Sequence, residues 1–487
     1  MLLFLMTLFI PLSEWTTETI DELRIRGELP LVFTTIKPYE YAVIKGYLKN
    51  VDVSRLTTAK RLLVARLSMY YDRYSQPMLN LKLDAISDTG CSYFVRGGVN
   101  YLLHNLGVDI TLVAKFGESN AFPVKTWHYP HGDTVVGIDF YRAYVSGGNG
   151  NLRVTVGRLP VRWGYGLLVS GSTIPYDLIL LRYMRGACSF VYLFAPLDQY
   201  VSTDSLAPLL NRYFCAHRLD IALLEHKLIL SLGEGILFAR QDALSALYYL
   251  NPVAIYRLAE YNAHYARRAI GTYWFNDDLY WELGVTLYLK NTKLYFEWLL
   301  DDVGFVTDPY HPFVEDVMNS GPFAYILGVK RADILVDRTL WWLEYFHVNA
   351  YCYWHALPQN YFVCMGYPLA HRLGSDFDIT SLRVVYHHSM SLDIKLSVSC
   401  IRKGKTHLAI DGVSPPRNCF LWGIPQKMLK LHIGGEIFGT PWVVGGIDLS
   451  YSKIWNYGNK LGNNRSFWEA SFYGEFRTGF TPYDQAR

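Results

Sequence analysis

The chain has 487 residues, of which 51% are hydrophobic, 16% are aromatic and 18% are charged, and its formal net charge is +3. This composition is too apolar for a disordered chain, and 46 Lys and Arg against 43 Asp and Glu lack the basic excess of a nucleic-acid-binding protein. The 38 Tyr and 13 Trp, set against only 7 Cys, suggest one architecture that is repeated along the chain.

The N-terminus begins with an almost wholly apolar run from Met1 to Leu12. This run has the length of the hydrophobic region of a signal peptide and is too short to span a membrane. We therefore expect a signal peptide over residues 1–14, with a buried first strand or helix as the alternative. After it, no apolar run approaches the ~18 to 20 residues that a spanning helix needs, which excludes a helical inner-membrane protein.

Residues 15–77 have the periodicity of helices and predict a small helical subdomain. Thr17 is a candidate N-cap for the first helix, because acidic residues follow it and a glycine comes after the basic residues at the end. Pro38 fits the first position of a second helix. A third helix is expected after Asp52 or Ser54.

From residue 78 to residue 480 the apolar residues recur with a period of two, which is the period of β-strands. The clearest stretch runs from Trp468 to Phe480, where one face is apolar and the other carries charge. The stretches 283–289 and 108–116 alternate in the same way. A soluble β-sandwich also alternates, so this pattern does not by itself distinguish water from lipid as the solvent.

The lengths of the connections between these stretches are more specific, because short and long connections take turns along the chain. The short ones fall near residues 104–107, 146–150, 186, 225–227, 290–292, 333–337, 389–391 and 439–441. The long ones fall near residues 117–137, 159–177, 196–211, 238–279, 301–321, 354–378, 402–427 and 455–465. Such alternation is typical of membrane barrels, in which one rim has tight turns and the other has extended loops.

We therefore predict an all-β fold, a single transmembrane antiparallel β-barrel of about 18 strands over residues 78–480, with the small N-terminal α-helical subdomain at 15–77. An even strand number places the helical subdomain, both termini and the tail 481–487 on the short-turn side, which is the periplasmic side of a bacterial outer membrane. A large soluble β-assembly such as a propeller is the alternative, but no blade-length repeat is found.

The most distinctive motif is the segment from Gly157 to Gly166, which contains Arg158, Arg162 and Trp163. An indole face and a planar guanidinium can stack on a sugar and donate hydrogen bonds to its hydroxyls. The alternative is that both arginines pair with carboxylates of the barrel interior while the tryptophan packs at the rim.

The carboxylates Glu234, Glu297 and Glu344 are expected to line the polar lumen of the barrel. A pair of them could hydrolyse a glycan, but the sequence does not place any two at the required separation. No G-x-S-x-G, P-loop or H-E-x-x-H motif is present, and no cysteines or histidines have metal-ligand spacing, so the sequence gives no support for a hydrolase, a nucleotide-binding site or a metal site. We therefore name no catalytic, cofactor-binding or metal-ligating residue.

A further set of landmarks runs through nearly the whole chain in a particular order. They are Arg26-Gly27, Lys37-Pro38-Tyr39, Gly157-Arg158, Arg162 to Gly166, His217-Arg218-Leu219, Gly233-Glu234, Asn251-Pro252, Phe296-Glu297, Glu344-Tyr345, Asn349, Tyr351, and Gly366 to Gly374 ahead of Asp376. In this order of elements the sequence resembles the Wzi-type capsule assembly outer-membrane proteins.

The resemblance implies a β-barrel closed by helices that acts as a surface lectin and attaches capsular or other surface polysaccharide to the outer membrane, without enzymatic activity or cofactor. Its partners would be outer-membrane lipid and the polysaccharide, with no nucleic acid, and we expect a monomer. The candidate glycan-binding residues are then Arg158, Arg162, Trp163, His217 and Arg218. The alternative function is a porin-like or polysaccharide-conducting channel in the same fold.

Overall fold

The computed structural model is mostly β-structure with a few helices. It describes residues 5–6, 15–74, 78–88, 90–103, 106–118, 127–131, 134–149, 151–171, 175–201, 209–241, 244–260, 277–301, 322–355, 357–406, 408, 415, 419–440 and 443–479.

Three helices form the N-terminal subdomain: α1 (Trp15–Ile25), α2 (Tyr41–Asn50) and α3 (Thr58–Tyr74). Their apolar faces meet in a separate core that includes the fully buried Ile20, Ile44 and Leu67, so the subdomain predicted from helical periodicity is present. Two details differ from the prediction. Thr17 lies inside α1 rather than at its N-cap. Pro38 precedes α2, which begins after Glu40.

One large antiparallel sheet contains most of the remaining chain. Its strands are β1 (Leu5–Met6), β3 (Met78–Asp88), β4 (Gly90–Leu103), β5 (Leu106–Glu118), β6 (Trp127–His131), β7 (Thr134–Asn149), β8 (Leu152–Leu159), β10 (Tyr176–Arg185), β11 (Cys188–Tyr200), β12 (Leu210–Leu223), β13 (Leu228–Arg240), β14 (Asp278–Leu289), β15 (Thr292–Asp301), β16 (Phe323–Ala332), β17 (Thr339–Val348), β20 (Phe377–Ser389), β21 (Leu392–Lys403), β22 (Gln426–Thr440), β23 (Val443–Trp455) and β24 (Arg465–Gly479).

Smaller elements lie between these strands. They are the pair β2 (Ile36–Lys37) and β9 (Arg162–Trp163), the pair β18 (Val363–Cys364) and β19 (Tyr367–Pro368), and the 3₁₀ helices η1 (Val53–Arg55), η3 (Leu244–Tyr249), η4 (Pro358–Asn360) and η5 (Tyr457–Asn459).

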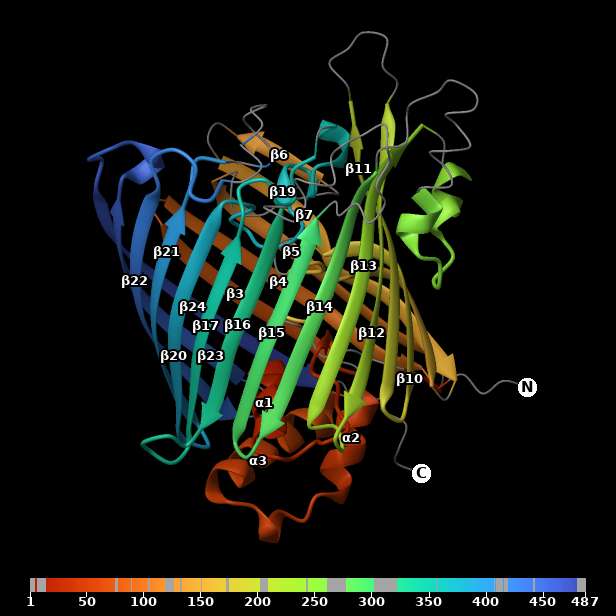
Figure 1. Ribbon diagram of the computed structural model, residues 1–487. Helices are drawn as coiled ribbons and strands as arrows, with labels where there is room; N and C mark the ends of the chain where they lie inside the picture. Colours follow the sequence, from red (N-terminus) through yellow and green to blue (C-terminus); the bar gives the residue numbers. More distant parts are fainter. Residues whose placement is uncertain are drawn as a thin grey trace.

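Two pairings of the large sheet link strands that are not consecutive in the chain. The last strand, β24, pairs with β3 from Ala470 opposite Ser87 to Gly479 opposite Met78. The strands β8 and β10, which are separated by the inner segment that carries β9, also pair with each other. Figure 1 shows the sheet curving round on itself.

The short connections predicted from alternation lie at or beside strand boundaries, so those predictions are confirmed. Two short connections were missed. One lies between β3, which ends at Asp88, and β4, which begins at Gly90. The other lies between β6, which ends at His131, and β7, which begins at Thr134, inside the long connection predicted at 117–137. We call the end of the sheet that carries the short connections and the helices the turn end. The opposite end, which carries the extended segments, is the loop end (Figure 1).

The two faces of the sheet differ in polarity, as β15 illustrates. Lys293, Tyr295 and Glu297 are buried on the inner face, whereas Leu294 and Phe296 are 39% and 42% exposed on the outer face. Within the described residues, no helix has the length and apolar character to cross a membrane.

The inner face surrounds the largest apolar core of the protein. Strand residues such as Phe214, Leu299 and Phe346 contribute to it, together with two segments that fold inward, residues 160–171 and 349–376. The interior is therefore packed with side chains of the chain itself rather than lined only by the strands.

Candidate functional site

Helix α1 is held against the inner face of the sheet by buried ion pairs. Asp21 accepts hydrogen bonds from the ammonium groups of Lys293 at 2.8 Å and Lys330 at 2.7 Å. Burial alone would raise the pKa of Asp21, but the two lysines outweigh it and hold that pKa well below its usual range. The carboxylate is therefore charged and fastens the helix to β15 and β16.

The neighbouring Glu22 makes a second attachment. It accepts a 2.8 Å hydrogen bond from Arg26, and its other oxygen lies 2.8 Å from His387 Nε2. His387 Nδ1 is in turn 2.9 Å from Asp393, which also binds Arg66 of α3. Burial opposes ionisation, yet the cationic partners lower the pKa of Glu22 to about 2. Helices α1 and α3 are thus joined to β20 and β21.

A fully buried arginine organises the middle of the interior. Arg218 donates to Asp220 at 2.9 Å, to Glu282 at 2.7 Å and to Glu297 at 3.1 Å. Glu297 also accepts a 2.5 Å hydrogen bond from the backbone N–H of Tyr165. The cluster therefore fixes the inner segment 160–171 to the wall of the sheet, and this is the role that the geometry gives to Arg218 and Glu297.

The distinctive arginine–tryptophan segment packs within the chain. Arg158 makes a two-pronged pair with Asp177 of the adjacent strand at 2.6 and 2.8 Å and also contacts Asp139. Arg162 donates to the Tyr165 carbonyl at 2.6 Å, and the side chain of Trp163 is fully buried in the main core. These contacts match the packing alternative in part: Arg158 pairs with carboxylates, but Arg162 bonds to a backbone carbonyl and Trp163 lies in the core rather than at the rim. Glycan binding by these residues stays a prediction.

His217 and Glu234 lie on the outer face of the sheet, 3.4 Å apart. Glu234 accepts the backbone N–H groups of Tyr256 and Arg257 at 2.9 and 3.0 Å, so the segment 244–260 covers it. This placement differs from the predicted lumen position of Glu234. The physical reason is the period of two, since Glu234 shares its face with the exposed Leu232.

Glu344 faces the interior, as predicted, and accepts a 2.5 Å hydrogen bond from the Tyr295 hydroxyl. Trp342 donates its indole N–H to the same hydroxyl at 2.6 Å. Tyr295 stacks on Tyr165, with ring centroids 3.8 Å apart. Of the three predicted lumen carboxylates, the structure thus places Glu297 and Glu344 inside the sheet, each bonded to residues of the chain.

At the loop end, the segment between β17 and β20 presents a row of half-buried aromatic rings. The ring centroids of Tyr351 and Trp354 are 4.8 Å apart, and those of Trp354 and Tyr361 are 5.6 Å apart. We call Tyr351, Trp354 and Tyr361 the aromatic platform. It lies at the same end of the sheet as β19, at the top of Figure 1.

Hydrogen bonds tie the backbone of the platform segment to the neighbouring strands. Arg212 of β12 donates to the carbonyls of Gln359 at 2.6 Å and Tyr361 at 2.5 Å, and it pairs with Asp198 of β11 at 2.8 Å. Asp198 also accepts the backbone N–H of Met365 at 2.7 Å. The backbone of this part of the segment is therefore bonded to β11 and β12.

The layer beneath the platform is a continuation of the main core. Tyr353 stacks on Phe362 with ring centroids 5.2 Å apart and donates its hydroxyl to the Leu167 carbonyl at 2.6 Å. Nearby, burial lowers the pKa of His371 to about 3, so its imidazole is neutral at neutral pH.

Sequence reasoning singled out Tyr351 only as a landmark and did not identify the platform. The available signal was the density of aromatic residues between Tyr351 and Tyr367 in a segment outside the strands. In the part of the chain that the structure describes, no group of three or more His, Cys, Asp or Glu side chains has a geometry that could hold a metal ion.

Comparison with known proteins gives structural matches only. No protein-family model matches the sequence, and no curated protein matches it. The fold is similar to that of Wzi from Escherichia coli, described as an outer-membrane protein involved in group 1 capsule assembly and as a carbohydrate-binding β-barrel. That match has 12% identity, covers 98% of this chain and 100% of Wzi, and has a TM-score of 0.66.

Two Pseudomonas aeruginosa proteins also match. OprD has 9% identity, with 84% of this chain and 96% of that chain covered and a TM-score of 0.43. OccK3 (OpdO) has 11% identity, with 85% and 100% covered and a TM-score of 0.44. The match to Wzi shows that this chain has a Wzi-like fold, which is a fold of outer-membrane β-barrels.

Proposed function

We propose that this chain is a closed outer-membrane β-barrel that binds a surface polysaccharide and anchors it to the cell surface. The large sheet has 20 strands, of which the short β1 and β6 lie outside the ring of pairings, so the barrel has 18. Closure gives every backbone N–H and C=O of the strands a partner, which hydrocarbon cannot supply.

An apolar belt on the outer face of β17 and β20 to β23 supports the membrane location. Cross-strand neighbours along one row are Leu343 and Leu382, then Val398, Leu431 and Tyr451. The aliphatic members of this row are 40% to 48% exposed. An exposed row of this kind is costly in water and favourable against acyl chains.

The orientation follows from the two ends of the barrel. Outer-membrane barrels have short turns on the periplasmic side and longer loops outside. The turn end, with α1 to α3, would therefore be periplasmic, and the loop end with the aromatic platform would face the surroundings of the cell.

The proposal of polysaccharide binding rests on the aromatic platform. Half-buried rings such as Trp354 and Tyr361 offer flat apolar faces for the C–H side of a sugar ring, and nearby polar groups can meet its hydroxyls. The backbone of the platform segment is bonded to β11 and β12 at the loop end, where an extracellular polymer would approach. The carbohydrate-binding character of Wzi, whose fold is similar, agrees with this assignment.

The packed interior favours an anchor over a channel. The inner segments 160–171 and 349–376 join the main core, and α1 is attached across the turn end by the pairs of Asp21 and Glu22. We propose a non-enzymatic role for the same reason, because Glu282 and Glu297 are both bound to Arg218 inside this packed region.

Binding of purified protein to a panel of bacterial surface polysaccharides tests the proposal. The variant Trp354→Ala should bind its polysaccharide about tenfold or more weakly, as expected for loss of an aromatic anchor. The matched control is Trp468→Ala, because Trp468 is 65% exposed on the membrane-facing side. Equal binding by both variants would contradict the platform, and large steady conductance in planar bilayers would favour the channel.

A further inference from the structure

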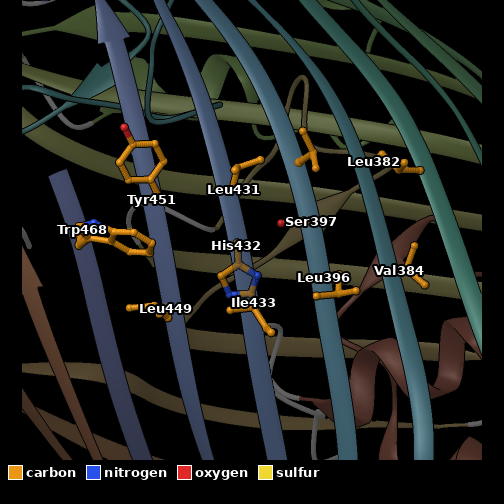
Figure 2. A pocket seen from close by; sticks show the side chains of 11 residues that line it. Leu382, Val384, Leu396, Ser397, Leu431, His432, Ile433, Leu449, Tyr451 and Trp468 are labelled. Carbon is orange, nitrogen blue, oxygen red and sulfur yellow. The ribbon is translucent and has the colours of Figure 1, made fainter. Parts of the chain in front are cut away.

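The outer face of the barrel has an apolar groove that crosses strands β20 to β24. Its volume is about 470 Å³, and Val398, Leu431, Ile433, Leu449 and Trp468 are among the side chains that line it (Figure 2). This volume lies in the range of sites that hold ligands of substantial size. The groove therefore lies within the apolar belt, because Leu382, Val398 and Leu431 belong to both.

Three cationic side chains stand on the same outer face, between the groove and the loop end. Lys453 is two residues beyond Tyr451, which lines the groove, and this separation corresponds to about 7 Å along the strand. Arg402 is four residues beyond Val398, or about 13 Å. Lys427 pairs in register with Arg402, and all three side chains are exposed.

The charge of this group is only partly neutralised. Arg402 donates to Asp378 at 2.9 Å. On the described parts of β20 to β24, Asp378 is the one carboxylate that shares the outer face, since Glu436 and Glu469 face inward. Lys453 lies 5.2 Å from the ring centroid of Trp455, an arrangement suited to the boundary between lipid and water.

We propose that the groove and these cations form a binding site for a phosphorylated, multiply acylated lipid of the outer leaflet. Acyl chains would fill the groove, and Arg402, Lys427 and Lys453 would bind the phosphate groups above it. This inference rests on the proposed membrane location and goes beyond polysaccharide binding. The cations lie at the loop end of the belt, so the headgroup would sit at the outer surface.

Two lipids distinguish phosphate recognition from acyl burial. One is a bis-phosphorylated, acylated glucosamine disaccharide (lipid A), and the other is the same lipid with both phosphates removed. Native mass spectrometry of the purified full chain in detergent, titrated with each lipid, gives the two affinities. The wild-type protein should bind the phosphorylated form at least tenfold more tightly, because each cation near an anionic headgroup contributes roughly fivefold.

The test variant is Arg402→Gln/Lys427→Gln/Lys453→Gln. It should lose at least tenfold in affinity for the phosphorylated lipid and bind the dephosphorylated lipid as the wild type does, which also shows that its groove is intact. The variant Lys427→Gln/Lys453→Gln leaves the Arg402–Asp378 pair in place and should lose a smaller factor. A triple variant that keeps wild-type affinity for the phosphorylated lipid would overturn the proposal.

The matched control, Lys227→Gln/Lys290→Gln/Arg331→Gln, removes the same charge from exposed positions at the turn end. It should bind both lipids within about twofold of the wild type, and a tenfold loss would show that only net charge matters. Membrane fractionation of cells tests the premise separately. Wild-type protein outside the outer membrane would refute the proposed location, whereas outer-membrane protein with equal affinity for both lipids would refute this site alone.

Discussion

The attachment of helix α1 makes a quantitative prediction through the substitution Asp21→Asn. Asp21 is buried between Lys293 and Lys330, and the side chains of the three residues are 4%, 2% and 10% exposed. Removing one partner from a buried ion pair costs roughly 3 to 5 kcal/mol, because the remaining charges lose their compensation. Since the amide oxygen can still accept a hydrogen bond, we expect the lower figure, about 3 kcal/mol.

Hydrogen–deuterium exchange of the backbone amides of Trp15–Ile25 measures this effect in the intact protein. A loss of about 3 kcal/mol in the free energy of local opening should accelerate exchange of α1 roughly 100-fold, because about 1.4 kcal/mol corresponds to a factor of ten. The matched control is Asp52→Asn in the same subdomain. Its pair with Arg55 is solvent-exposed and should change exchange by about twofold or less.

The result that would refute this reasoning is specific. If Asp21→Asn accelerates exchange of α1 no more than Asp52→Asn does, the buried pairs do not hold the helix against the sheet. If exchange accelerates equally throughout the barrel strands, the aspartate stabilises the whole fold rather than the attachment of α1.

Three further predictions concern pH and two tightly packed positions. Because the pKa of Glu22 in the folded protein is about 2, below its ordinary value of 4.5, its stabilising contribution is complete above about pH 4.5. Exchange of α1, corrected for intrinsic rates, should therefore accelerate as the pH falls from about 4.5 toward 2. Gly164→Ala should lower the free energy of unfolding by about 2 to 4 kcal/mol, because φ is +49° and the new Cβ would lie 2.1 Å from a Glu297 oxygen. Gly435→Ala, where nothing lies within 4 Å, should leave the thermal unfolding midpoint in detergent within a few degrees of the wild type. Asp376→Ala should destabilise the loop end, because that carboxylate accepts backbone N–H groups including that of Leu421 at 2.6 Å, and limited proteolysis near residue 420 should become faster.

The alternation of apolar and polar residues was sufficient to predict the β-strands and most of the short connections between them. Alternation of polarity reflects which face of a strand is buried, and it is present in the sequence whatever the distant parts of the chain do. The same rule places Glu234 on the outer face, since it shares parity with Leu230 and Leu232. Reading that carboxylate as a lumen residue gave more importance to its charge than to its position.

The filling of the interior could not be predicted in this way. Trp163 and Arg162 resembled a sugar site in sequence, but the segment that holds them is drawn inward by contacts with residues far along the chain. Tyr165, for example, bonds to Glu297, and Tyr353 donates to the Leu167 carbonyl. The aromatic platform depends on a similar long-range contact, because Arg212 fixes the backbone of Tyr361. Such contacts leave no periodic pattern.

Deletion of the protein, followed by quantification of cell-bound and released surface polysaccharide, tests the anchoring role most directly. The account predicts that total polysaccharide stays constant while most of it moves into the medium, and that the wild-type chain restores retention whereas Trp354→Ala does not. Unchanged retention on cells that lack the protein would contradict the account.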